Sequence, residues 1–145
     1  MNPRIFNELK ILYQIFKNIT IVGLSDFKCQ ITIMDDKYQY KFIVLSTYPF
    51  TPPIEILINN IPYSKYLKVI RAFMPILKKH YGIDCLCCTS LNCISNWTTS
   101  LSLIKIIDEF KENLIVKKNI QMIYFCKMIK HKYNCEFAEI ELYIF

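Results

Sequence analysis

The sequence predicts a single α+β domain, in which one amphipathic helix precedes a four-stranded antiparallel meander and further helices complete the chain. Apolar residues recur at helical spacing near the N-terminus. Four β-like runs then follow, and the segments between them are too short for crossover helices. With 145 residues, of which 53% are hydrophobic and 21% charged, the chain is long enough for one well-packed core.

The first helix is expected over residues 3–17. Pro3 suits the first helical position, and Asn2 suits the N-cap before it. Ile5, Leu9 and Leu12 form an apolar stripe, whereas polar residues occupy the other faces. We therefore expect this helix to pack one face onto the core.

Four strands are expected next, over residues 18–24, 27–34, 38–45 and 54–58. The short acidic segment between the second and third strands is typical of a tight hairpin turn. The sequence YPFTPP at 48–53 separates the third strand from the fourth. Each of its three prolines fixes φ and removes a hydrogen-bond donor, which excludes a helix interior or a central strand. This segment, the proline turn, is expected to be rigid and extended.

The second half of the chain is expected to be mainly helical. Residues 64–80 carry an apolar stripe at helical spacing, which Pro75 must break or kink. After a cysteine-rich loop, Ser100 is expected to cap a strong helix. Another helix is expected over about 116–130, and the alternating run 135–145 suits a final strand.

Composition excludes several classes of protein. No apolar run is long enough to span a membrane and the N-terminus does not resemble a signal peptide, so we expect a cytosolic or nuclear protein. Four of the seven cysteines crowd between residues 85 and 93, unlike the cysteines of secreted disulfide scaffolds. The net charge is +6, but no glycine-rich loop or repeated exposed aromatic residues accompany the basic segment 64–80. Nucleic acid is therefore not an expected partner.

Three motifs in this order resemble the ubiquitin-conjugating (E2) family. RIFNEL at 4–9 is similar to the family's R-I-x-x-E-L, and YPFTPP is similar to its Y-P-F-x-P-P. Cys85-Leu86, followed by WTTSL at 97–101, resembles the family's C-L and W-x-P-x-L segments. The resemblance covers about residues 3–115. It implies a UBC-like fold for a single domain over 1–145, with a divergent C-terminal tail at 116–145.

The resemblance also implies an activity and partners. Such a protein takes ubiquitin or a ubiquitin-like modifier from an activating enzyme (E1) as a thioester and passes it to lysine with a ligase (E3). No membrane is implied. By the same resemblance, Arg4 and Lys10 would face the activating enzyme, and Phe50 would contact a ligase.

Two cysteines are candidates for the nucleophile. Cys88 best fits the family's spacing to the tryptophan and is slightly favoured, whereas Cys85 fits the family's Cys-Leu pair. A free thiol has a pKa of about 8.5, so some thiolate is present at neutral pH without a histidine partner. Asn96 and Asn92, and also Asn59, are candidate amide donors to the oxyanion.

The family pattern is incomplete in this chain. No His-Pro-Asn tripeptide precedes Cys85, and Thr99 stands where the family has a proline after its tryptophan. These departures favour an alternative function, that of a catalytically inactive E2 variant or an RWD-type interaction module. The conjugating enzyme is the interpretation we favour.

No cofactor is expected for a conjugating enzyme, but zinc is an alternative for the same loop. His80, Cys85, Cys88 and Cys93 are four soft ligands at knuckle-like spacing. A third interpretation is that these thiols are small apolar groups that fill the core.

Overall fold

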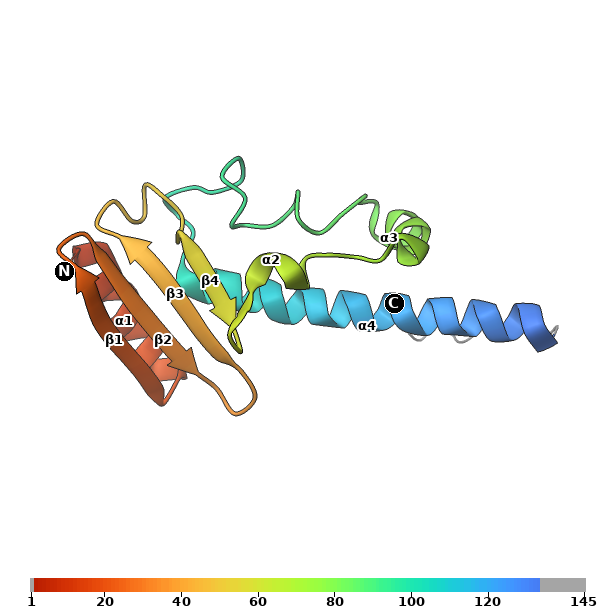
Figure 1. The fold of residues 1–145 in the computed structure, drawn as a ribbon, viewed down its shortest axis with the longest axis horizontal. Helices are drawn as coiled ribbons and strands as arrows, with labels where there is room; N and C mark the ends of the chain where they lie inside the picture. Colours follow the sequence, from red (N-terminus) through yellow and green to blue (C-terminus); the bar gives the residue numbers. More distant parts are fainter. Residues whose placement is uncertain (1, 134–145) are drawn as a thin grey trace.

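The computed structural model describes residues 2–133, which form an α+β fold, as the sequence predicts. Its elements follow the chain in this order: α1 (Pro3–Ile15), β1 (Asn18–Ser25), β2 (Lys28–Met34), β3 (Gln39–Leu45), β4 (Glu55–Ile58), β5 (Ile61–Pro62), α2 (Tyr63–Tyr66), the 3₁₀ helix η1 (Arg71–Phe73), α3 (Met74–Tyr81) and α4 (Leu103–Tyr133). Figure 1 shows α1 lying along the sheet, while α4 extends from the sheet to the far end of the molecule.

Helix α1 begins as the sequence predicts. The side-chain Oδ1 of Asn2 accepts a hydrogen bond from the Arg4 N–H at 2.8 Å, and Pro3 occupies the first turn. The helix buries its apolar stripe and ends at Ile15, because the backbone of Phe16 is extended and leads into β1.

The strands form an antiparallel meander in which each strand pairs with the next. Asp35 closes the β2–β3 hairpin, since its Oδ1 accepts from the N–H groups of Lys37 (2.8 Å) and Tyr38 (2.7 Å). One face of the central strands is buried, as the alternation of a half-buried sheet requires. Its buried side chains are those of Ile31, Ile33, Tyr40, Phe42, Val44, Ile56 and Ile58.

The sheet has five strands, so the prediction of four was wrong. Asn59 and Asn60 have φ values of 50° and 62°, which a two-residue hairpin turn requires and asparagine tolerates. This turn brings the chain back alongside β4 as the two-residue strand β5. Such a short edge strand has almost no periodicity of its own, which is why the pattern did not reveal it.

The helical segment predicted over 64–80, with a break or kink at Pro75, is divided into three short helices in the structure. Helix α2 ends at Tyr66, the backbone of Ile70 is extended, and α3 begins at Met74. Pro75 lies in the first turn of α3, where its missing N–H costs no helical hydrogen bond. Pro75 does interrupt the predicted helix, but it does so by starting a new one.

The two helices predicted near 100–114 and 116–130 are one helix, α4, of 31 residues. Ser100 is not its cap, because the Ser100 hydroxyl is hydrogen-bonded to the Thr98 hydroxyl at 2.9 Å. Instead, the N–H of Leu103 donates to a carboxylate oxygen of Glu8, in α1, at 3.2 Å. A carboxylate at this position satisfies a free N–H and interacts favourably with the helix dipole.

Helix α4 is fixed against the sheet and α2 by a group of aromatic rings around Phe110. The centroid of its ring lies 5.0 Å from that of Tyr38 and 5.1 Å from that of Tyr66, both in edge-on geometry. The rings of Tyr40 and Tyr63 lie slightly farther away.

None of the described helices is both long and apolar enough to cross a membrane. The strand predicted over 135–145 lies outside the described residues.

Candidate functional site

The candidate site lies on the segment between α3 and α4, which contains no regular helix or strand. We call residues 85–93 the cysteine loop. Two of its residues point inward: Leu86 is 2% exposed and Ser90 is 1% exposed. The segment returns from α3 toward the sheet alongside α4 (Figure 1). The loop is therefore anchored in the fold although most of it lies at the surface.

A carboxylate of α4 holds the middle of the cysteine loop. Glu109 accepts a hydrogen bond from the Ser90 hydroxyl at 2.9 Å and another from the Leu91 N–H at 2.8 Å. The Tyr63 hydroxyl donates to the same carboxylate. Glu109 is not among the site residues that the sequence predicts, although its place beside the apolar residues Ile106, Ile107 and Phe110 was a signal. Charge-assisted bonds of this kind are about twice as strong as neutral ones.

The proline turn contacts the segment that follows the cysteine loop. The indole N–H of Trp97 donates to the carbonyl oxygen of Pro49 at 2.7 Å. The ring centroids of Tyr48 and Trp97 are 6.0 Å apart, and the Tyr48–Pro49 peptide bond is cis. Two motifs that are about fifty residues apart in the sequence are thus joined directly.

Glu8 joins the proline turn to the two helices. Its carboxylate, on a residue only 8% exposed, accepts from the Tyr48 hydroxyl at 2.7 and 2.8 Å and from Arg4 Nε at 2.9 Å. The Arg4 guanidinium also donates to the Leu101 carbonyl at 3.1 Å. Burial and the hydrogen bond to Glu8 raise the pKa of Tyr48 well above its usual value. The buried carboxylate of Glu8 is therefore paired with the Arg4 guanidinium, and both of its oxygens accept hydrogen bonds.

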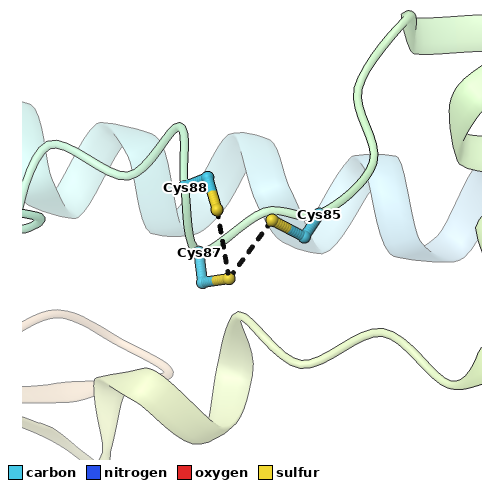
Figure 2. A group of neighbouring side chains, drawn as sticks. All are labelled: Cys85, Cys87 and Cys88. Carbon is cyan, nitrogen blue, oxygen red and sulfur yellow. Dashed lines mark hydrogen bonds between the residues drawn. The ribbon is translucent and has the colours of Figure 1, made fainter.

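Three thiols of the cysteine loop gather at the surface (Figure 2). The Cys87 thiol donates to the Cys85 sulfur at 3.3 Å, and the Cys87 and Cys88 sulfurs are 3.9 Å apart. All three sulfur atoms lie within 4.8 Å of one another. Cys87 and Cys88 are exposed, while Cys85 is half-buried. We call these three residues the thiol cluster.

Within the thiol cluster, the pKa values of Cys85 and Cys88 are shifted in opposite directions. Interaction with Cys88, and then with Cys87, whose thiol donates to the Cys85 sulfur, lowers the pKa of Cys85. The reciprocal interaction with Cys85 raises the pKa of Cys88 to about 12. Cys93 lies apart from the cluster. Its contact with the Ser95 hydroxyl, at 3.1 Å, lowers the Cys93 pKa.

The predicted oxyanion donors occupy different positions. The side-chain amide of Asn96 donates to the carbonyl oxygens of Cys88 (2.6 Å) and Ser90 (3.0 Å), so both of its protons hold the cysteine loop. The Asn92 side-chain oxygen is buried without a hydrogen-bond partner among the described residues. Asn59 lies in the β4–β5 turn, where its side chain accepts from the backbone. Oxyanion support by Asn96 or Asn92 stays a prediction.

The predicted partner-binding residues differ in how available they are. Phe50, on the proline turn, is 80% exposed, and the Lys10 ammonium lies 4.6 Å from the centre of the exposed Phe6 ring. Arg4 is half-buried and forms the internal contacts described above. Phe50 and Lys10 thus offer free surface, whereas the main contacts of Arg4 lie within the protein.

The ligands proposed for zinc are not brought together as one set. Among the described residues, the thiols close enough to share an ion are Cys85, Cys87 and Cys88, and neither His80 nor Cys93 belongs to that group. Cys85 and Cys88 therefore lie beside Cys87, and the other two predicted ligands, His80 and Cys93, do not join them.

No model of a known protein family matches the chain, and comparisons with characterised proteins and with solved structures find no match either.

Proposed function

We propose that the protein is a divergent ubiquitin-conjugating carrier, which holds ubiquitin or a ubiquitin-like modifier as a thioester on Cys85 and passes it to lysine. The observation that carries the proposal is the convergence of the segments that resemble the family. Glu8 binds both Tyr48 and the start of α4, and Trp97 binds Pro49, beside a loop with solvent-accessible thiols.

Contacts within the thiol cluster favour Cys85 as the nucleophile over Cys88, which the spacing to the tryptophan favours slightly. The Cys85 sulfur accepts the Cys87 thiol at 3.3 Å, and a donor at this position stabilises the thiolate form. Leu86 anchors the neighbouring backbone in the core, so Cys85 is held at the edge of the fold with its side chain partly open to solvent.

In the proposed reaction, the Cys85 thiolate attacks the carbonyl carbon of the thioester between the modifier and the activating enzyme. The bond from that carbon to the activating enzyme's sulfur breaks, and this sulfur leaves as a thiolate. A lysine amine of the substrate then attacks the new thioester and loses a proton to solvent, while the Cys85 thiolate is released. Both steps exchange acyl groups without a change in oxidation state.

A non-catalytic interaction module of the inactive E2-variant or RWD type is the second candidate. One observation favours it: both amide protons of Asn96 bind backbone carbonyls, which they would have to leave in order to stabilise an oxyanion. Phe50 and Ile94, which are 80% and 82% exposed, would then serve as contacts for a partner.

The test is incubation of the full chain with activating enzyme, ATP and ubiquitin, followed by a non-reducing gel. We expect a band heavier by one modifier that disappears on addition of thiol and is missing in Cys85→Ala. Cys93→Ala is the matched control and should keep the band, because Cys93 lies outside the thiol cluster. Absence of the band with ubiquitin and with a panel of ubiquitin-like modifiers and their activating enzymes would favour the interaction module.

A further inference from the structure

We propose that the thiol cluster of Cys85, Cys87 and Cys88 is a binding site for one soft cation, Cu(I), coordinated by three thiolates. This inference does not rest on the proposed transfer activity, because it depends only on the positions and chemistry of the three sulfur atoms.

The spacing of the sulfurs suits a single ion. Metal–thiolate bonds of about 2.3 Å place three sulfurs around a central ion at about 4 Å from one another. The Cys87 sulfur lies 3.3 Å from that of Cys85 and 3.9 Å from that of Cys88, and the whole cluster falls within 4.8 Å. Figure 2 shows the three side chains turned toward a common point, with dashed lines joining the Cys87 sulfur to each of the other two. Only small side-chain adjustments separate this arrangement from a trigonal site.

The backbone of the cluster is held by hydrogen bonds at Leu86 and Cys88, and the residue Ser90 just beyond it is held as well. The Thr89 hydroxyl donates to the Leu86 carbonyl at 3.1 Å, and Leu86 itself is buried between the first two ligands. Asn96 binds the backbone carbonyl of Cys88, the third ligand, and Glu109 binds the hydroxyl of Ser90, two residues farther along the chain. Partners that orient the ligands in this way strengthen metal binding, because less order has to be imposed when the ion arrives.

The ligand set selects the ion. Zinc sites formed by protein ligands alone are typically four-coordinate, and no fourth histidine, cysteine or carboxylate of the described residues joins the cluster. Thiolate ligands without nitrogen or oxygen partners favour Cu(I), which is soft. Exposure of Cys87 and Cys88 gives the ion a path to the site. Binding releases the protons of those ligands that are still thiols and changes no oxidation state.

The test is an anaerobic titration of the full chain with Cu(I) buffered by bicinchoninate, whose coloured complex reports the copper that the protein removes. We expect one Cu(I) per chain. Cys87→Ser should weaken binding by more than about 100-fold, since the loss of even an outer partner of a metal site costs about 10–100-fold. Cys93→Ser, the matched control on the same loop, should bind like the wild type.

Several outcomes would overturn the inference: full Cu(I) affinity in Cys87→Ser and Cys88→Ser, equal weakening in Cys93→Ser, or preferential retention of Zn(II) in a competition between the two ions. Circular dichroism of each variant checks that the fold is intact, which we expect because both Cys87 and Cys88 are exposed. The titration contains no modifier or activating enzyme, so its failure and the failure of thioester formation on metal-free protein are separate results.

Discussion

The hydroxyl of Tyr48 donates to both carboxylate oxygens of Glu8, at 2.7 and 2.8 Å, inside the core. This contact joins the proline turn to α1, and the same carboxylate accepts from the first N–H of α4. Elements from three distant parts of the chain therefore depend on one buried charge. The loss of a partner from such a charge is costly because the charge remains desolvated.

We expect Tyr48→Phe to lower the free energy of unfolding by about 1–3 kcal/mol, the usual cost of leaving a buried hydrogen-bonding group without its partner. Urea unfolding followed by circular dichroism measures this loss. Tyr13→Phe, at an exposed position of α1, is the matched control and should change stability little. Equal unfolding midpoints for the two variants would contradict the assigned role of the Tyr48–Glu8 contact.

Glu109 is expected to control the accessibility of the loop thiols. Glu109→Ala removes the acceptor for the Ser90 hydroxyl and the Leu91 N–H, so the cysteine loop should detach more often from α4. Its thiols should then react several-fold faster with a disulfide reagent such as DTNB. Glu112→Ala, three residues along the same helix at an exposed position, should leave the rate unchanged. The same rate of reaction with DTNB in both variants would show that Glu109 does not hold the cysteine loop against α4.

The Trp97–Pro49 hydrogen bond should contribute measurably to stability. Trp97→Phe keeps an aromatic ring near Tyr48 but removes the donor, so we expect a loss of about 0.5–1.5 kcal/mol together with some loss of packing. Denaturant unfolding, followed by circular dichroism because Trp97 is the sole tryptophan, provides the value. Phe50→Ala on the neighbouring exposed position should be close to neutral, and a larger effect there than at Trp97 would contradict the prediction.

Asp35 is expected to make the free energy of unfolding depend on pH in the acid range. Partial burial alone raises the pKa of this carboxyl, but hydrogen bonds from the Lys37 and Tyr38 backbone, from Tyr40 and from Lys111 outweigh it and lower the pKa below 3.8. A carboxyl that is more acidic in the folded state stabilises the fold above its unfolded pKa. This contribution is lost as the pH falls through the folded pKa.

We therefore expect Asp35→Asn to cost about 1 kcal/mol at pH 7, the usual net contribution of one hydrogen bond to stability. The difference from wild type should start to shrink below about pH 4, where the unfolded carboxyl takes up a proton, and should be lost once the pH falls below the lower pKa of the folded carboxyl. Thermal unfolding at several pH values measures this convergence. Asp36→Asn, at the exposed neighbouring position, should show no comparable trend. A constant difference from pH 7 to pH 2 would exclude the carboxyl as the cause.

The sequence allowed the elements of the candidate site to be predicted, but not the contacts between them. The YPFTPP turn, Trp97 and the crowded cysteines were all recognisable from residue type and spacing. Glu109 was not recognised, because only folding brings its carboxylate to Ser90 and Leu91. Cys87 was not predicted as a metal ligand, because the spacing along the sequence suggested His80 and Cys93 beside Cys85 and Cys88. In the structure, the loop turns Cys87 toward Cys85 and Cys88.

Local chemistry by itself determined where α1 begins, where the β2–β3 hairpin turns and where a helix cannot continue. A capping side chain, a turn-forming aspartate and a proline act within a few residues of themselves. Only the tertiary structure decided that α4 is one helix starting at Leu103, with Glu8 of α1 at its N-terminus. It also decided that three thiols share one small volume, because long-range packing sets the course of a loop that has no regular secondary structure to direct it.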